Sequence, residues 1–279
     1  MRQNCHIFLK VQGTKINADG VLCMLYEGND FRASNFRAAK KGKRRWYSWP
    51  KYYFQTSPLR RLSKWQLLKI AGKIGSRRFA GKQEVTQPNH PLYSVSWLPL
   101  TIAAENETAN FAFDVKRLKE HLITEEDFKN SKGAQETMRL LKEMKQKCQE
   151  QNKKLVLLYA PDAPHVLMEM MAAQIPAEQI AAFLSTTKGK LPDTKSIWQE
   201  LCQGCEIREM VIKQFCEQEN INFLSLTEAL KAATARGKQT YFCYDQHWTP
   251  YGHEVVAEFL ATTLPDIINT QNEADEAAK

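Results

Sequence analysis

Three short apolar runs along the chain predict buried strands. They are VLCMLY at 21–26, KKLVLLYAP at 153–161 and INFLSL at 221–226. Runs of this length, rich in aliphatic residues and bounded by polar or turn-forming residues, are typical of strands covered on both faces in a parallel sheet. The first run ends at Gly28-Asn29-Asp30, which is favourable turn chemistry.

Apolar residues recur at helical spacing between these strands. Residues 131–152 begin with a serine that can cap a helix, and Met138, Leu141, Met144 and Cys148 follow on one face. The same pattern predicts helices at 163–173, 176–186, 194–219, 227–237 and 252–264, and one at 58–74. Residues 84–113 contain three prolines among short apolar alternations, so we expect irregular extended structure or a small hairpin there.

The order of the predicted elements is typical of an α/β domain with a mainly parallel sheet. It is a strand, a long helix, a strand, further helices, a strand and a helix. We therefore expect three layers, α/β/α. Sites in such sheets form beyond the carboxyl ends of the strands. Two unusual loops occupy such positions, Gly28-Asn29-Asp30 and Asp245-Gln246-His247.

The net charge of +8 is confined to one segment. Residues 31–82 carry sixteen Lys and Arg and no Asp or Glu, interleaved with Trp and Tyr. The remainder of the chain is acidic. Three interpretations remain open: a solvated insert whose rings pack on the domain, a surface for an anionic membrane or an acidic glycan, and a nucleic-acid site. Nucleic acid is the least favoured, because no nucleic-acid fold signature accompanies the charge.

Pattern and charge together divide the chain into four segments. We predict core with the Asn29 loop at 1–30, a basic aromatic insert at 31–110, the main core at 111–265 and a flexible tail at 266–279. No apolar run approaches the roughly 18–20 residues that span a bilayer. The first thirty residues contain no signal-peptide pattern.

The seven cysteines favour reduced thiols, because their number is odd and the chain is long. Cys202 and Cys205 have C-x-x-C spacing, but no second pair or redox context accompanies them. Asp245, His247 and His253 do not form a spaced ligand cluster. We predict no metal and no cofactor.

Asp245 and His247 suggest acid–base chemistry. A carboxylate that accepts the Nδ1 hydrogen of an imidazole fixes its tautomer and stabilises the imidazolium that forms when Nε2 takes a proton. Two residues apart on an extended segment, the two side chains point to the same side. The amide of Asn29, at the end of a buried strand, can donate to an oxyanion. The alternatives are an Asp–His pair that only caps a helix, and an asparagine that only forms a turn.

Two blocks carry a family resemblance. VLCMLYEGND resembles the asparagine block of the SGNH/GDSL hydrolases, and DQHWTPYGH resembles their last block in the D-x-H-W form of bacterial SGNH hydrolase-like proteins and polysaccharide O-acetyltransferase relatives. The resemblance covers 19–30 and about 111–264. It implies a flavodoxin-like SGNH fold with His247 as base, Asp245 as its acid partner and Asn29 as oxyanion donor. Gly28, Trp248 and His165 are expected to contact substrate.

The chain departs from the family pattern at the nucleophile. It contains no G-D-S block, no serine before Ser34 and none after His247. We expect a chain that lacks its first strand and its nucleophilic serine, and is inactive as written. A diverged pseudoenzyme is the alternative.

The resemblance implies a serine esterase or acyltransferase acting on O-acyl groups of a small molecule or polysaccharide, such as acetyl-carbohydrate. The alternative is a non-catalytic module that docks on a membrane or anionic polymer through residues 31–82. Relatives of this kind are often exported or membrane-anchored. The oligomeric state is not predicted.

Overall fold

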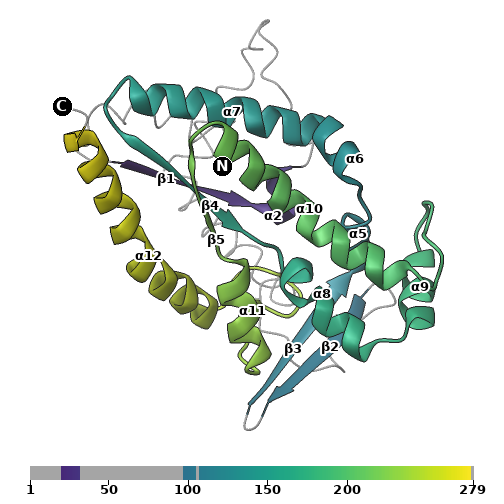
Figure 1. The fold of residues 1–279 in the computed structure, drawn as a ribbon. Coiled ribbons are helices and arrows are strands. Elements are labelled where there is room, and N and C mark those ends of the chain that lie inside the picture. The colour runs from purple at the N-terminus through teal and green to yellow at the C-terminus, as the bar shows by residue number, and fades with distance from the viewer. Residues whose placement is uncertain (1–19, 32–96, 105–106, 278–279) are drawn as a thin grey trace, which may run out of the picture. The chain divides into compact units, whose positions relative to one another are not determined.

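A three-stranded parallel sheet forms the centre of the protein (Figure 1). The computed structural model describes residues 20–31, 97–104 and 107–277, all within one compact unit. Its strands are β1 (Gly20–Tyr26), β4 (Lys154–Ala160) and β5 (Asn222–Ser225), in the order β1-β4-β5. The three predicted strands and their parallel pairing are confirmed.

The central strand β4 is covered on both faces, as its uninterrupted apolar sequence predicts. Leu155, Leu157 and Tyr159 pack into one hydrophobic cluster, and Val156, Leu158 and Ala160 pack into another. This alternation is the two-residue period of a strand. The sheet therefore separates two layers of helices, and the three-layer α/β fold is confirmed.

One face of the sheet is covered by α7 (Lys132–Gln149) and by the C-terminal half of α10 (Ile197–Gln218). The hydroxyl of Ser131 accepts a hydrogen bond of 3.1 Å from the backbone N–H of Ala134, so the predicted serine cap is present. Apolar residues at helical spacing, including Leu141, Met144 and Cys148, form the buried side of α7.

The other face is covered by α8 (Ala163–Gln174), α9 (Ala177–Ser185), α11 (Thr227–Ala235) and α12 (Pro250–Ala277). Short helices connect the layers: α2 (Glu27–Asp30), α5 (Val115–Lys119) and α6 (Glu125–Asn130). Helix α12 continues through Pro265 to Ala277, so the predicted helix end at residue 264 was wrong.

A β-hairpin packs into the same core as the helices. Strands β2 (Trp97–Ala104) and β3 (Glu107–Asp114) pair antiparallel, as the hairpin alternative predicted. Their alternate residues, among them Leu100 and Phe111, are buried against the α8–α12 layer. The predicted boundary of the insert at residue 110 falls within β3.

The basic segment 31–82 and the predicted helix 58–74 lie outside the described residues, except for Phe31. In the part of the chain that the structure describes, no helix is long and apolar enough to cross a membrane.

Candidate functional site

Asp245 and His247 meet in a tight turn that precedes α12. His247 Nδ1 is hydrogen-bonded to Asp245 Oδ1. The His247 side chain is 73% exposed and that of Asp245 is 27% exposed. The bond occupies Nδ1, so Nε2 is the ring nitrogen left for proton transfer at the surface.

The pair meets for a different reason from the one that the sequence predicted. The segment is a turn rather than an extended strand, and Gln246 between the two residues has a left-handed φ of 59°. The backbone N–H groups of Gln246 and Phe242 close the turn, donating to Phe242 O (3.1 Å) and His247 O (2.8 Å) respectively. Gln246 is buried and its side-chain amide donates to Ala112 O at 3.4 Å, which holds this uncommon backbone conformation.

The start of α12 anchors the other end of the turn. Thr249 Oγ1 accepts a hydrogen bond of 3.1 Å from the backbone N–H of Gly252 and donates to the carbonyl of Gln239. A Cβ atom at Gly252 would lie 2.2 Å from the backbone oxygen of Thr240, so a glycine is required by this close approach. The Trp-Thr-Pro-x-Gly sequence therefore fixes the helix against the preceding segment.

Strand β3 of the hairpin is hydrogen-bonded to the segment that leads into this turn. The backbone N–H of Ala112 donates to Cys243 O at 3.1 Å, and that of Asn110 donates to Gln239 Oε1 at 2.8 Å. The rings of Trp97 and Tyr244 meet edge to face at 5.1 Å. Sequence patterns did not predict this contact, because the hairpin is far from the turn along the chain.

The end of β1 lies beside the turn. The hydroxyl of Tyr26 donates to the backbone carbonyl of Gln246 at 3.4 Å. Gly28 is buried, and a Cβ atom there would lie 2.7 Å from the Tyr26 ring. Asn29 is exposed, next to this contact in the sequence. The segment Gly28-Asn29-Asp30, which forms part of the short helix α2 rather than a turn, therefore closely follows a residue that contacts the turn bearing His247.

Trp248 and His253 both follow the exposed His247 in the sequence. Trp248 is half-buried, and its ring meets that of His253 edge to face at 5.5 Å. His253 is exposed in the first turn of α12. These positions leave the expected contact of Trp248 with substrate as a prediction.

His165 has a different environment from the other predicted residues. It lies in the first turn of α8 and its side chain is fully buried. Nδ1 is 2.8 Å from Glu27 Oε2, and the same oxygen accepts from the backbone N–H of Asp162 at 3.2 Å. His165 therefore belongs to a buried polar network rather than to a solvent-facing surface.

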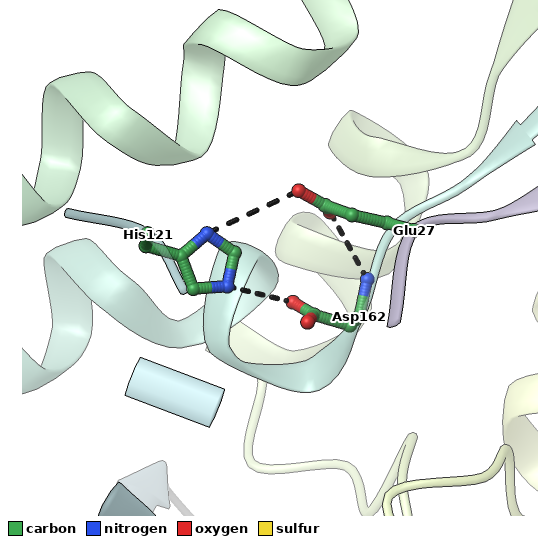
Figure 2. A group of neighbouring side chains, drawn as sticks. All are labelled: Glu27, His121 and Asp162. Atoms are coloured by element: carbon green, nitrogen blue, oxygen red, sulfur yellow. Dashed lines mark hydrogen bonds and ion pairs between the residues drawn. The ribbon is translucent and has the colours of Figure 1, made fainter. Parts of the chain in front are cut away.

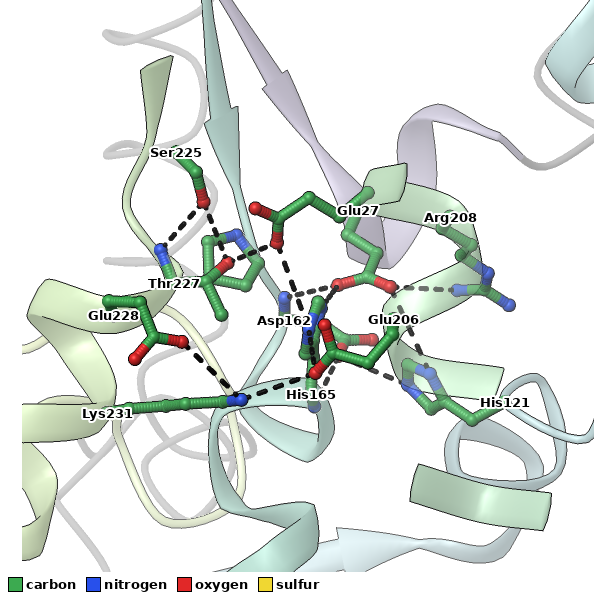
Figure 3. A network of polar contacts seen from close by, with 12 residues as sticks. Glu27, His121, Asp162, His165, Glu206, Arg208, Ser225, Thr227, Glu228 and Lys231 are labelled. Carbon is green, nitrogen blue, oxygen red and sulfur yellow. Dashed lines mark hydrogen bonds and ion pairs between the residues drawn. The ribbon is translucent and has the colours of Figure 1, made fainter. Parts of the chain in front are cut away.

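This network joins the carboxyl ends of β1 and β4 to α10 (Figure 3). Arg208 Nη1 is 3.7 Å from Glu27 Oε1, and its Nη2 donates to the carbonyl of Glu120. His165 Nε2 lies 3.7 Å from Glu206 and 3.9 Å from Glu209. Two residues of α11 extend the network. Thr227 Oγ1 donates to Glu209 Oε2 at 2.6 Å, and Lys231 Nζ lies 3.3 Å from Glu206 Oε1.

Opposite charges set the protonation of the network. Burial opposes the charged form of His165, but the carboxylate of Glu27 raises the pKa of His165 to about 10. Its interaction with His165 lowers the pKa of Glu206 to about 2. Burial would also raise the pKa of Asp162, yet the neighbouring His121 shifts that pKa below its ordinary range. The network therefore holds charged groups of both signs.

Glu27, His121 and Asp162 form the innermost part of the network (Figure 2). Their side chains are at most 1% exposed. His121 Nε2 lies 3.2 Å from Asp162 Oδ1, and His121 Nδ1 lies 3.9 Å from Glu27 Oε1. Among the described residues this is the group whose ligand atoms are close enough to hold a metal ion. Asp245, His247 and His253 are not such a group.

The sequence analysis did not identify this cluster. Glu27 directly follows the apolar run of β1, and Asp162 comes two residues after β4, the neighbouring strand. Their shared position at the carboxyl ends of adjacent strands was the sequence feature that could have identified them. Nothing local distinguishes His121 and Arg208, because a single charged residue in a polar or amphipathic stretch ordinarily faces solvent.

No described serine is hydrogen-bonded to His247. Ser131 caps α7, Ser185 and Ser196 bond to nearby helix or turn groups, and Ser225 bonds to Thr227. Residues 20–31, 97–104 and 107–277 therefore contain no serine that is hydrogen-bonded to the imidazole.

Comparison with known families supports the resemblance. Residues 208–279, about a quarter of the chain, match the family model of the SGNH hydrolase-like domain of the acetyltransferase AlgX. The matched range includes Asp245 and His247 and begins at Arg208 of the buried network. No curated protein and no solved structure matches the chain significantly.

Proposed function

We propose that this chain, which is SGNH-like over residues 208–279, carries a site for O-acyl esters of the esterase or acyltransferase type, with an acetylated carbohydrate as substrate. The observation that carries the proposal is the bond between Asp245 and the Nδ1 atom of His247. It orients an exposed imidazole as a general base, within the sequence range that matches an acetyltransferase-related domain.

His247 would take the proton of an attacking hydroxyl at Nε2. Asp245 would keep the imidazole in the tautomer that has Nε2 unprotonated, and would stabilise the imidazolium once it forms. Exposure of the ring gives a bulky carbohydrate access to it. The half-buried Trp248 beside it offers an aromatic face for a sugar ring.

Asn29 would donate its side-chain amide to the developing oxyanion. The bond between Tyr26 and Gln246 supports this role, because it joins the end of β1, three residues before Asn29, to the turn that bears His247. Loss of one such donor costs about 2.7–4 kcal/mol of barrier in enzymes of this kind. Gly28 allows the close packing of Tyr26 at this strand end.

The lack of an identified nucleophilic serine limits the catalytic activity expected of this chain. The sequence has no G-D-S block, and no described serine contacts His247. We therefore expect the 279-residue chain to bind O-acyl esters without hydrolysing them above the background rate.

The experiment measures binding and turnover separately. Calorimetric titration compares an acetylated oligosaccharide with its deacetylated counterpart, and p-nitrophenyl acetate reports turnover. We expect preferential binding of the acetylated form, reduced about threefold to tenfold in Asn29→Ala because a hydrogen bond to the acyl carbonyl is lost. Glu258→Ala, at an exposed position of α12 that contacts neither Trp248 nor His247, is the control.

Each outcome has a distinct meaning. Turnover that His247→Ala abolishes and Glu258→Ala preserves would support the acid–base roles and overturn the expected inactivity. Equal affinity for both oligosaccharides, together with no turnover, would contradict the O-acyl-ester proposal.

The alternative function is docking on an anionic membrane or polymer through residues 31–82. Their sixteen cations and interleaved aromatic residues are the observation that favours it. Co-sedimentation with vesicles of phosphatidylserine and phosphatidylcholine, lost at high salt and absent with phosphatidylcholine alone, is the expected result for this alternative. The absence of sedimentation at low salt would exclude the vesicle surface as the target.

A further inference from the structure

Four buried polar atoms at the centre of the network have no hydrogen-bond partner. They are Glu27 Oε1, both ring nitrogens of His121, and Asp162 Oδ2. More than nine in ten buried polar groups in proteins are paired, and an unpaired one costs about 1–3 kcal/mol. Four such atoms on three adjacent side chains indicate that a further group belongs between them.

A proton on His121 does not satisfy this cluster. An imidazolium would face Asp162 Oδ1 at 3.2 Å, but its Nδ1 is 3.9 Å from Glu27 Oε1, which is longer than a hydrogen bond. Glu27 Oε1 would still lack a hydrogen bond, because its ion pair with Arg208 Nη1 is also long, at 3.7 Å. A cation between the three side chains can contact all of them.

The surrounding groups hold the three side chains in place. His165 Nδ1 and the backbone N–H of Asp162 occupy Glu27 Oε2, which directs Oε1 toward His121. Asp162 also caps α8, because its Oδ1 accepts from the backbone N–H of His165 at 3.1 Å. Arg208 is held by the carbonyl of Glu120. Such partners orient the ligands of metal sites.

We propose that Glu27, His121 and Asp162 bind a divalent transition-metal ion, of which Zn²⁺ is the representative. Each residue offers one ligand atom, and the three atoms lie within 4.8 Å of one another. Metal–ligand distances of about 2.0–2.2 Å place two ligands of one ion at most about 4.4 Å apart, so a small side-chain adjustment closes the site. One imidazole nitrogen and two carboxylate oxygens suit Zn²⁺ or Mn²⁺ better than Cu(I).

The ion would have a structural role. The three ligands come from the start of α2, directly after β1, from the turn after β4 and from the segment after α5. All are at most 1% exposed to solvent. An ion that binds the folded chain more tightly than the unfolded chain stabilises the fold. This inference is independent of the proposed function, because Asp245 and His247 are not among the ligands.

Binding is measured on the full chain after treatment with a chelator. Calorimetric titration with Zn²⁺ is expected to show one equivalent bound per chain, and thermal unfolding is expected to shift upward by several degrees. Titration with Co²⁺ identifies the ligand type. Nitrogen and oxygen ligands give weak visible bands, whereas cysteine ligands add a strong thiolate charge-transfer band in the near ultraviolet.

Two variants locate the site. His121→Gln removes the nitrogen ligand and is expected to weaken Zn²⁺ binding at least tenfold, while His253→Gln, an exposed histidine, leaves it unchanged. Asp162→Asn is the second ligand variant. Circular dichroism verifies that each variant is folded before it is titrated, and the wild-type titration stands if a variant does not fold.

Three results would overturn the proposal. They are no saturable Zn²⁺ binding by the wild-type chain, a thiolate band in the Co²⁺ spectrum of the first equivalent, and unchanged Zn²⁺ affinity in a folded His121→Gln or Asp162→Asn variant. The first would leave buried water as the partner of the unpaired atoms. The other two would assign binding to cysteines or to surface groups.

Discussion

The hydroxyl of Tyr26 donates a hydrogen bond of 3.4 Å to the backbone carbonyl of Gln246. Gln246 stands between Asp245 and His247, and Tyr26 is three residues before Asn29. This contact joins the two motif blocks of the sequence across the carboxyl end of the sheet. The ring of Tyr26 therefore links the segment that precedes Asn29 to the turn that bears His247.

Gly28→Ala is predicted to destabilise the protein through that ring. The new Cβ atom would lie 2.7 Å from the Tyr26 ring, which must shift and release Gln246. We expect a loss of about 1–3 kcal/mol in the free energy of unfolding, measured by urea denaturation. In a Tyr26→Ala background the same change should cost at least 0.5 kcal/mol less, because contacting residues are not additive. Equal costs in both backgrounds would show that the ring is not the cause.

Gly252→Ala should disturb the turn that bears His247. Its Cβ atom would lie 2.2 Å from the backbone oxygen of Thr240, and a backbone atom cannot rotate away. We expect a cost of about 1–3 kcal/mol or more in the free energy of unfolding. Glu258→Ala, an exposed position further along α12, is the matched control and should change stability by less than about 0.5 kcal/mol. A Gly252→Ala protein as stable as this control would contradict the structural reason.

Removal of the buried carboxylate of Glu27 should be far more costly than removal of an exposed one. Glu27→Ala leaves His165 and Arg208 buried without their shared partner, and we expect a loss of about 3–5 kcal/mol in the free energy of unfolding. Glu136→Ala removes an exposed ion pair with Arg139 and should cost less than about 1 kcal/mol. Thermal or urea unfolding measures both. Similar losses for the two variants would mean that the network adds no stability.

The two buried thiols of α10, Cys205 and Cys216, should be alkylated more slowly than the half-buried Cys202 of the same helix. Burial raises the pKa of Cys216 to about 12, and burial together with the carboxylates of Glu27 and Asp162 raises the pKa of Cys205 well above its ordinary value. Since the thiolate is the reactive species, alkylation of the native protein by iodoacetamide at pH 8 should be slow at both residues, and should become rapid in urea. Peptide mass spectrometry measures the labelling. Cys202, half-buried on the same helix, is the internal comparison.

The same measurement tests the C-x-x-C pair. A redox pair needs a thiolate of lowered pKa, whereas burial raises the pKa of both Cys202 and Cys205. We expect no disulfide between them after mild oxidation. A mass loss of two hydrogens in the peptide that contains both residues would contradict this.

Local patterns were sufficient for much of the fold. Continuous apolar runs marked β1, β4 and β5, because a strand covered on both faces needs apolar side chains in both directions. Helical spacing and the cap at Ser131 marked α7. The end of α12 was misplaced, because Pro265 usually ends a helix and here lies within one.

The candidate site, like the fold, was predicted from the sequence only in part. The sequence pointed to Asp245 and His247 as a pair, since a carboxylate and an imidazole two residues apart can meet within one short segment. It did not reveal the left-handed conformation of Gln246, which depends on the distant Ala112.

The amino-acid sequence by itself determined which segments form helices and strands, and which chemical groups meet within a single segment. Both depend on residues that are neighbours along the chain. Only the folded chain could bring Glu27, His121 and Asp162 together, and join Tyr26 to Gln246. Those contacts arise where parallel strands end side by side and helices from distant segments cover them. The energy of burying a charge depends on such partners, and no local pattern encodes it.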